Sequence, residues 1–493
     1  MSRAVFDFDN SYASLPARFF SQLAPEPVAA PQLIRLNEAL AETLGLDAAA
    51  LASPEGVAVL AGNAVPEGAA SIATVYAGHQ FGHFVPQLGD GRAWLLGEVV
   101  GRDGVRYDVQ LKGSGRTPYS RGGDGRAPLG PVLREYVVSE AMASLGVPTT
   151  RSLAAVASGE HVLRQQRLPG AVLTRVAQSH IRVGTFEYFA ARGDTEGLER
   201  LLAHVIERHY PEARDADDPA LALLERVVAR QAELVARWQL LGFIHGVMNT
   251  DNMLVSGETI DFGPCAFMDG FDAAQVYSSI DHAGRYAYRN QPAIAAWNLA
   301  SLASALLPLS KADSEESAVQ AARERIERFE ARFIAAYRDG LRRKLGLLET
   351  RDDDDALCDA LLEAMQRSSA DFTLTFRWLT DLAAPSADRP LAGVYELPAA
   401  LTPWIDRWRA RLADEPADSE TRHAAMRAVN PAIIPRNHLV EQLIAAAIDE
   451  GDFGPFHRLV DALAEPYADV ARAAELLAPP RPGEIVQQTF CGT

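Results

Sequence analysis

The feature that most constrains the fold is a succession of segments between residues 218 and 263. A long helical pattern at 218–241 is followed by the polar loop HGVMNTDN at 245–252. The next segment, NMLVSGETIDFG, predicts a short β-hairpin that turns at Ser256-Gly257 and ends at Asp261-Phe262-Gly263. An acid followed by a flexible turn at the end of a buried hairpin can place a carboxylate on a metal ion bound to phosphates. The succession therefore points to phosphate chemistry.

Kinase-like phosphotransferases share this order of helix, loop, hairpin and acid, and their loop reads His-x-Asp-x-x-x-x-Asn. Here His245 and Asn252 keep the spacing, but Val247 occupies the place of the aspartate. A second acid, Asp251, directly precedes Asn252. The loop thus keeps the asparagine that faces the metal and lacks the usual catalytic base. The alternative is a plain turn in which Asn and Asp serve as cap residues.

The tripeptide Asp-Phe-Gly occurs a second time, at Asp452-Phe453-Gly454. No strand pattern precedes this copy, which lies between two helical patterns. We therefore predict a turn between helices at this place.

Lysine is rare, because only Lys112, Lys311 and Lys344 accompany the arginines among the 47 basic residues. Lys112 ends the strand-like run YDVQLKG, where a kinase-like fold has a lysine that binds nucleotide phosphates and pairs with a glutamate of the next helix. The helical pattern at 130–145 offers Glu135, with Glu140 as the other possibility. Lys311 and Lys344 lie in polar helical stretches, where we expect them at the surface.

Two glycine-rich turns, at 89–92 and 123–126, both read Gly-Asp-Gly-Arg. Glycine allows close approach of the backbone, and arginine offers a fork that suits phosphate. The loop at 113–126 also places Arg116, Arg121 and Arg126 close together in an acidic protein, which indicates an anion site. A solvated loop is the alternative.

The order of these patterns predicts an α+β protein. Residues 1–65 are expected to be an N-terminal extension with a short helix at 33–46, and residues 66–180 a small lobe of strands with one inserted helix. Residues 181–477 are mostly helical. The helical patterns there lie at 218–241, 314–345, 353–369 and 436–449, and residues 478–493 form a Pro-rich, irregular tail.

Composition excludes several classes of protein. The net charge of −18 argues against a general nucleic-acid binder, which needs a basic surface. The chain shows no apolar run of roughly 18 residues, the length of a membrane span. The first residues carry acids and no apolar core of a signal peptide, so we expect a cytoplasmic protein. Three cysteines cannot build a disulfide framework.

Taken together, the motifs resemble the SelO (YdiU) family of selenoprotein-O-like pseudokinases. The matching stretches are YAGHQFGHFVPQLGDGRAWLLGE, LKGSGRTPYSRGGDGRAPLGPVLREYVVSEAM, HGVMNTDNML, IDFGPCAFMD and NPAIIPRNHL. The resemblance covers nearly the whole chain. It implies a two-lobed, protein-kinase-like fold with a small β-rich N-lobe and a large helical C-lobe.

The resemblance also implies a protein adenylyltransferase, which transfers AMP from ATP to Ser, Thr or Tyr hydroxyls of proteins and releases pyrophosphate. Mg²⁺ would be the cofactor, with Mn²⁺ as an alternative. Asp251 would accept the proton, Asn252 and Asp261 would hold the metal, and Glu135 would pair with Lys112. The nucleotide contacts would be Gly89, Gly91, Arg92, Lys112, Asp124, Gly125, Arg175, Arg182 and Asp261.

Family members carry a cysteine or selenocysteine near the C-terminus, and this chain has Cys491 there. Cys265 lies just after the first Asp-Phe-Gly, so the resemblance favours a reversible Cys265–Cys491 disulfide over two unrelated thiols. Cys358, in the helical run ALCDALLEAM, is expected to stay reduced and buried.

Three other functions remain open on the sequence. A protein or small-molecule kinase is disfavoured by Val247, because valine cannot accept a proton. A catalytically dead scaffold is disfavoured by the intact Lys112, Asn252 and Asp261. The third is a transferase of UMP that uses UTP with manganese.

Overall fold

The computed structural model describes residues 6–384, 391, 393–468 and 474–490. Its largest sheet has eight strands in the order β1-β3-β6-β7-β10-β9-β2, with β8 paired to β10, and all of its pairings are antiparallel. The strands of this sheet are β1 (Phe20–Gln22), β2 (Gln32–Leu36), β3 (Ile72–Thr74), β6 (Ala93–Val100), β7 (Arg106–Lys112), β8 (Ala127–Pro128), β9 (Arg151–Leu163) and β10 (Arg167–Ala177). Two further antiparallel pairs join β4 (Gly78–Gln80) to β5 (His83–Val85) in a hairpin and β11 (Phe243–Ile244) to β12 (Ala266–Phe267).

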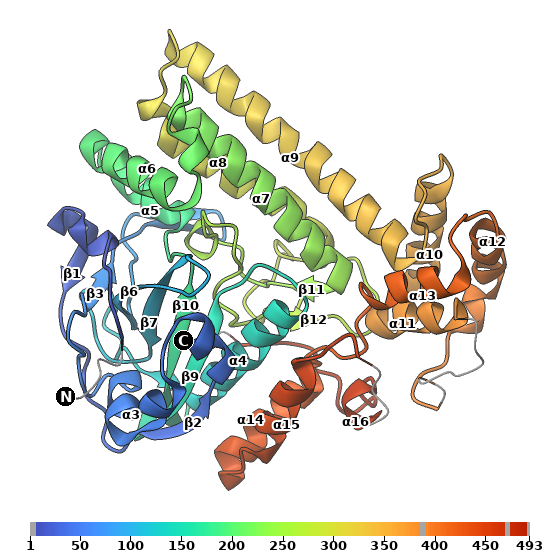
Figure 1. The fold of residues 1–493 in the computed structure, drawn as a ribbon, viewed down its shortest axis with the longest axis horizontal. Helices are drawn as coiled ribbons and strands as arrows, with labels where there is room; N and C mark the ends of the chain where they lie inside the picture. Colours follow the sequence, from blue (N-terminus) through green and yellow to red (C-terminus); the bar gives the residue numbers. More distant parts are fainter. Residues whose placement is uncertain (1–5, 385–390, 392, 469–473, 491–493) are drawn as a thin grey trace.

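Helices make up most of the remaining ordered structure (Figure 1). They are α1 (Glu38–Thr43), α2 (Ala48–Ala52), α3 (Pro54–Leu60), α4 (Leu129–Ser144), α5 (Val183–Ala190), α6 (Thr195–His209), α7 (Pro219–Leu241), α8 (Gln291–Leu306), α9 (Glu315–Lys344), α10 (Asp354–Ser368), α11 (Phe372–Leu382), α12 (Thr402–Leu412), α13 (Ser419–Arg427), α14 (Asn437–Ala445), α15 (Gly454–Leu463) and α16 (Ala474–Leu477). The chain therefore has the mixed helix-and-sheet composition that the sequence predicts.

Side chains of the central strands alternate between two cores, because successive residues of a strand point to opposite faces. On β7, Val109 and Leu111 pack into the core under helices α1 to α3. The intervening residues Asp108, Gln110 and Lys112 point to the other face of the sheet. Helix α4 lies on that same face, where it packs against β9 and β10 and is backed by α14 and α15. The polar residues of β7 therefore bind other polar groups on this face: Lys112 binds Glu135 of α4, Gln110 binds Arg175 and Asp108 binds Arg208.

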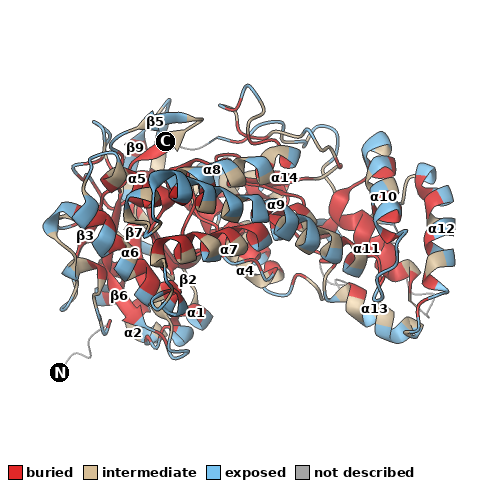
Figure 2. Ribbon diagram, turned by 90° about the horizontal axis from the view of Figure 1, so that it is seen from above, coloured by how far each residue is buried: buried red, intermediate tan, exposed pale blue. Residues whose placement is uncertain are grey.

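Helix α7 is the buried axis of the helical region, and the longer α9 packs along its outer side (Figure 2). Asp218 caps its start by accepting a hydrogen bond from the backbone N–H of Leu221, and Pro219 is the first helical residue. Gly242 ends the helix at φ +69°, a left-handed conformation that glycine adopts without strain. This stop turns the chain directly into β11 and the loop at 245–252.

The predicted hairpin over NMLVSGETIDFG is wrong in its pairing. Its turn is present, since Gly257 N–H donates to the Leu254 carbonyl at 3.2 Å. However, Leu254 forms its bridge with Arg182, and Thr259 forms its bridge with Thr149. The two arms therefore form single bridges with neighbouring segments of the chain, and not with each other.

The predicted helix at 33–46 is also wrong in its first part. Residues Gln32–Leu36 form β2, in which Leu33 lies opposite Val156 of β9, and the helix begins only at Glu38. Pairing with the sheet overrides the local helical pattern. The N-terminal segment contributes both outer strands of the sheet order, β1 and β2.

Lys344 was expected at the surface and is instead buried, with 3% of its area exposed. It ends α9, and its ammonium lies 4.5 Å from the centre of the Phe376 ring on α11. The helical pattern alone did not show that another helix packs over this end. Lys311 is exposed, as predicted.

One helix, over Tyr288–Leu309, is long and apolar enough to cross a membrane by length and composition. Its inward residues pack on α5, α7 and α9, and the polar Asn298 is fully buried among them. We interpret it as a core helix.

Candidate active site

A cavity of about 870 Å³ opens between the sheet, helix α4 and the loop at 245–252. Its lining includes every residue to which the family resemblance gives a nucleotide, metal or proton-transfer role, together with Glu135. These are Gly89, Gly91, Arg92, Lys112, Asp124, Gly125, Glu135, Arg175, Arg182, Asp251, Asn252 and Asp261. A smaller pocket of about 290 Å³ beside α7 and α9 contains none of them.

The centre of the site is an ion cluster around Asp261. Lys112 Nζ lies 2.8 Å from Asp261 Oδ1 and 2.6 Å from Glu135 Oε2. Arg175 Nη1 lies 2.7 Å from Asp261 Oδ1, and Arg182 Nη1 lies 2.8 Å from Asp261 Oδ2. Three cations thus converge on one carboxylate.

The cluster controls the protonation of Asp261. Burial by itself would raise the pKa of this carboxyl, but the charges of Lys112, Arg175 and Arg182 outweigh it and hold the pKa well below its ordinary value. The residue has φ +61°, a left-handed conformation that aspartate tolerates better than most side chains. Asp261 is therefore an anion throughout the physiological pH range, as a metal ligand must be.

Helix α4 supplies Glu135 and decides between the two glutamates that the sequence offered. Glu135 binds both Lys112 and Arg175. Glu140 lies farther along the helix and binds Arg151 at 2.7 Å. The lysine partner in the cavity is therefore Glu135.

The loop at 245–252 places its polar groups at the other side of the cavity. His245 is fully buried, and its Nε2 lies 2.8 Å from the Ile260 carbonyl, which ties the loop to the segment before Asp261. Asn252 Nδ2 donates to the Val247 carbonyl at 3.0 Å. Because the amide nitrogen is used there, the amide oxygen is the atom of Asn252 that can face a cation.

Asp251 is buried with 6% of its area exposed. Burial is the largest influence on its carboxyl and raises the pKa to about 6, although Arg182 opposes the shift. Its Oδ2 accepts a hydrogen bond from Gln80, while Oδ1 has no hydrogen-bond partner among the residues that the structure describes. Asp251 is thus a carboxylate with spare accepting capacity at a pKa near neutrality, which suits a general base.

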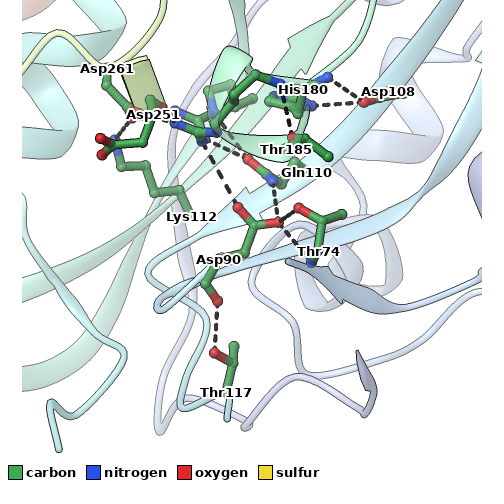
Figure 3. Close-up of polar contacts among 12 residues, drawn as sticks. Thr74, Asp90, Asp108, Gln110, Lys112, Thr117, His180, Thr185, Asp251 and Asp261 are labelled. Atoms are coloured by element: carbon green, nitrogen blue, oxygen red, sulfur yellow. Dashed lines mark hydrogen bonds and ion pairs between the residues drawn. The ribbon is translucent and has the colours of Figure 1, made fainter. Parts of the chain in front are cut away.

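Two residues that contact the arginines of the site, Gln110 and Asp90, were not predicted as site residues from the sequence (Figure 3). Gln110 Oε1 accepts from Arg175 Nε at 3.1 Å and Nη2 at 2.6 Å, and Gln110 Nε2 donates to Asp90 Oδ2 at 3.3 Å. Asp90 is held in turn by the backbone and the hydroxyl of Thr74. The available signal was the alternation of polar residues along β7, since Asp108, Gln110 and Lys112 share one face.

The glycine-rich loops lie over the cavity with their backbones close together. A side chain at Gly125 (φ +68°) would lie 2.0 Å from the Gly115 carbonyl oxygen, so only glycine fits. Asp124 is bound by Arg164, which the sequence reading also missed, at 2.9 and 3.1 Å. Arg121 and Arg126 line the cavity, whereas Arg116 is exposed outside it. The predicted group of three arginines is therefore a group of two in the cavity wall.

A metal ion fits this donor set as part of a nucleotide complex. The described residues contain no cluster of three or more His, Cys, Asp or Glu side chains that could hold a metal unaided. One carboxylate and one amide oxygen, from Asp261 and Asn252, are what Mg²⁺ uses when substrate phosphates and water complete its shell.

The C-terminal tail returns to the segment after Asp261. Thr489 is buried, and its hydroxyl donates to the Pro264 carbonyl at 2.6 Å. Its backbone N–H donates to Tyr277, and its carbonyl accepts from Ser279. Cys265 is buried beside this contact, and Cys358 is buried on α10. Cys491 lies outside the described residues.

Comparison with known proteins identifies the family of the chain. The family model described as protein adenylyltransferase SelO matches residues 3–464. A protein nucleotidyltransferase YdiU from Rhodopseudomonas palustris (strain BisB5) is 62% identical over 489 residues, and one from Bradyrhizobium diazoefficiens is 61% identical over 489 residues. Each alignment covers 99% of both chains. The chain is a nucleotidyltransferase, and it belongs to the SelO family of protein adenylyltransferases.

Proposed function

We propose that the enzyme transfers AMP from ATP to Ser, Thr or Tyr hydroxyls of cytoplasmic proteins and releases pyrophosphate. The observation that carries the proposal is the changed position of the acidic residue in the loop at 245–252. The kinase position holds the buried and apolar Val247. Asp251 offers a buried carboxylate, and its Oδ1 has no hydrogen-bond partner within the part of the chain that the structure describes. A base displaced from the kinase position suits a nucleotide that presents a different phosphorus to the acceptor.

In this proposal the fold is two-lobed and kinase-like, and ATP lies in the cavity with its α-phosphate nearest the acceptor hydroxyl. Lys112, Arg175 and Arg182 would exchange part of their contact with Asp261 for contact with phosphates. The turns with Gly89, Gly91 and Arg92, and with Asp124 and Gly125, would close over the rest of the nucleotide. Both turns line the cavity, which supports this arrangement.

Asn252 and Asp261 would hold Mg²⁺, with Mn²⁺ as the alternative. When bound, the ion supplies neutralisation of the phosphate charge that grows in the transition state. Asp251 would take the proton of the acceptor hydroxyl. Glu135 would hold Lys112 in place between the nucleotide and α4.

The labelled nucleotide decides between AMP transfer and the kinase alternative. With Mg²⁺ and ATP labelled on the α-phosphate, protein should become labelled and pyrophosphate should be released. ATP labelled only on the γ-phosphate should leave protein unlabelled. Incorporation of the γ-label without the α-label would establish a kinase instead, and the same assay with UTP and Mn²⁺ tests UMP transfer.

We also propose that a reversible Cys265–Cys491 disulfide regulates the enzyme. The contact of Thr489 with Pro264 supports it, because Cys265 follows Pro264 directly and Cys491 lies two residues after Thr489. A bond between them would fasten the tail to the segment that follows the metal ligand Asp261. In a cytoplasmic protein such a bond is typically regulatory.

A further inference from the structure

The small β4–β5 hairpin enters the site described so far only through the hydrogen bond from Gln80 to Asp251, and it has no assigned role. It is built from GHQFGHFV, within a motif that the sequence shares with the family, and it pairs Gly78 with Val85, His79 with Phe84 and Gln80 with His83. The turn between its strands is at Phe81-Gly82, where both residues have positive φ. Gln80 and Phe81 line the cavity, while His83 is exposed on the opposite strand.

Consecutive residues of the hairpin contact consecutive residues of the loop at 245–252. The backbone N–H of His79 donates to Thr250 Oγ1 at 2.7 Å, and that of Phe81 donates to Asn249 Oδ1 at 3.0 Å. Between them, Gln80 Nε2 donates to Asp251 Oδ2 at 3.2 Å. The hairpin thus holds the loop at three successive positions, 249 to 251, and its middle contact residue, Gln80, binds the carboxylate proposed as the base.

Residues of the hairpin and the loop also form hydrogen bonds with the helical region. Glu187 of α5 is buried, accepts from the Thr250 hydroxyl at 2.5 Å and lies 2.6 Å from His79 Nδ1. The same Asn249 Oδ1 that binds the hairpin also accepts from the Tyr286 hydroxyl at 2.7 Å. Loop and hairpin are therefore clamped together by a network anchored outside both of them.

The hairpin also approaches Asp251 closely through its backbone. A side chain at Gly78 would lie 2.4 Å from Asp251 Oδ1, so the contact requires glycine. The Asp251 carboxylate is therefore confined between the Gly78 backbone on one oxygen and the Gln80 amide on the other. A carboxylate confined in this way has one orientation, which general-base catalysis needs because proton transfer depends on a short, aligned contact.

We propose that Gln80 is a positioning residue for nucleotide transfer, which holds the Asp251 carboxylate in the orientation that receives the acceptor proton. The inference rests on the proposed role of Asp251 as the base. Gln80 acts on the acceptor side of the reaction, so its loss should slow the chemical step and leave the binding of ATP unchanged.

The test compares kcat and the KM for ATP in the full-length enzyme, using α-labelled ATP and self-modification or a generic protein acceptor. Gln80→Met keeps the length of the side chain and removes its donor. We expect kcat to fall about tenfold or more, the scale of one lost hydrogen bond to a charged group, with the KM for ATP within about twofold of wild type. Gln80→Glu places a second carboxylate beside Asp251 and should lower kcat at least as much.

His83→Met is the control, because it introduces the same residue at the exposed position opposite Gln80, and it should leave both constants unchanged. Thermal unfolding of each variant shows that it is folded. A Gln80→Met enzyme with wild-type kcat, or with a raised KM for ATP and unchanged kcat, overturns the positioning role. Asp251→Asn separates the two proposals: if it is inactive while Gln80→Met is fully active, the base stands and only the positioning role fails. A fully active Asp251→Asn enzyme overturns both.

Discussion

The two Asp-Phe-Gly sequences show how much the surroundings of a tripeptide decide. Asp261 is approached by Lys112, Arg175 and Arg182, and Phe262 is fully buried in the largest core. Asp452 is exposed, and its Oδ1 only accepts from the backbone N–H of Gly454 at 2.8 Å, which shapes the start of α15. The same three residues form a charged centre in one region and an ordinary turn between helices in the other.

Two lysines with little exposed area, Lys112 and Lys344, also differ in their surroundings. Lys112 lies between two carboxylates. Lys344 has a distant carbonyl, Val429 O at 3.5 Å, and the face of Phe376. Burial of a charged group therefore has opposite meanings in the two places. In the cavity it indicates function, and at the end of α9 it indicates a cost in stability.

The largest effect should come from removing the carboxylate at the charged centre. Asp261→Ala should lower nucleotide transfer by about a thousandfold or more, since it removes a proposed metal ligand and the anion that three cations share. Rates with α-labelled ATP measure the loss, and circular dichroism shows whether the variant stays folded. Asp452→Ala should keep activity within about twofold. Loss of activity in Asp452→Ala alone, with the fold intact, would reverse our assignment of the two copies.

The next largest effect should come from Lys112. Lys112→Met removes one of the cations that would meet the phosphates, and we expect transfer to fall about a hundredfold, the scale on which a single electrostatic contact to a transition state acts. Lys311→Met makes the same exchange at an exposed site and should have no effect. Equal activity of both variants would mean that the Lys112–Glu135 pair is only structural.

The sequence could predict the site residues that lie in motifs with fixed spacing, but not those that depend on contacts between distant segments. The catalytic loop, Asp261 and Lys112 lie in motifs with fixed spacing, so their convergence on one cavity could be anticipated. Gln80 and Gln110 act through contacts between segments far apart in the chain, and spacing within one segment carries no trace of such contacts. Lys344 was misplaced for the same reason, because the helix that buries it follows some thirty residues later.

The pairing of strands was the least predictable part of the fold. NMLVSGETIDFG has the turn and the alternation of a hairpin, yet its arms bind Arg182 and Thr149. LIRLNEALAETLGL has a helical period, yet its first residues extend the sheet beside β9. In both cases pairing with another segment of the chain overrides the local preference, which only the assembled structure can show.

A smaller and purely energetic effect should follow from Lys344. Burial lowers its pKa from 10.5 to about 7, so between these pH values the unfolded chain binds the proton and the folded chain does not. The free energy of unfolding should therefore rise with pH across this window, and the destabilisation is fully present below pH 7. Lys344→Met should stabilise the protein by a few kcal/mol at pH 6.5, at about 1.4 kcal/mol per pKa unit, and by less at pH 9.5.

Urea unfolding at the two pH values measures the difference between Lys344→Met and wild type, with Lys311→Met as the exposed control. Transfer activity of Lys344→Met should be normal, because the residue lies outside the cavity. If the free energies of unfolding of wild type and Lys344→Met change equally between the two pH values, Lys344 keeps its charge in the folded protein. Contacts other than those described above would then stabilise the charge.

The smallest expected effect concerns the tail, where the cysteines offer the last pair of contrasting regions. Cys265 lies beside the docked Thr489, in the segment that follows Asp261, while Cys358 is buried on α10 with its pKa raised to about 12 by burial. In oxidised protein, peptide mapping without reductant should find Cys265 joined to Cys491 and Cys358 unmodified. Reduction, or Cys491→Ser, should change the transfer rate only several-fold, because Thr489 can still hold the tail to Pro264 and Tyr277. Thr489→Val in the Cys491→Ser background then removes the remaining hydroxyl contact and should release the tail further, which limited proteolysis would detect. Full alkylation of both Cys265 and Cys491 under oxidising conditions would refute the disulfide, while the described contacts of Thr489 with this segment would stand.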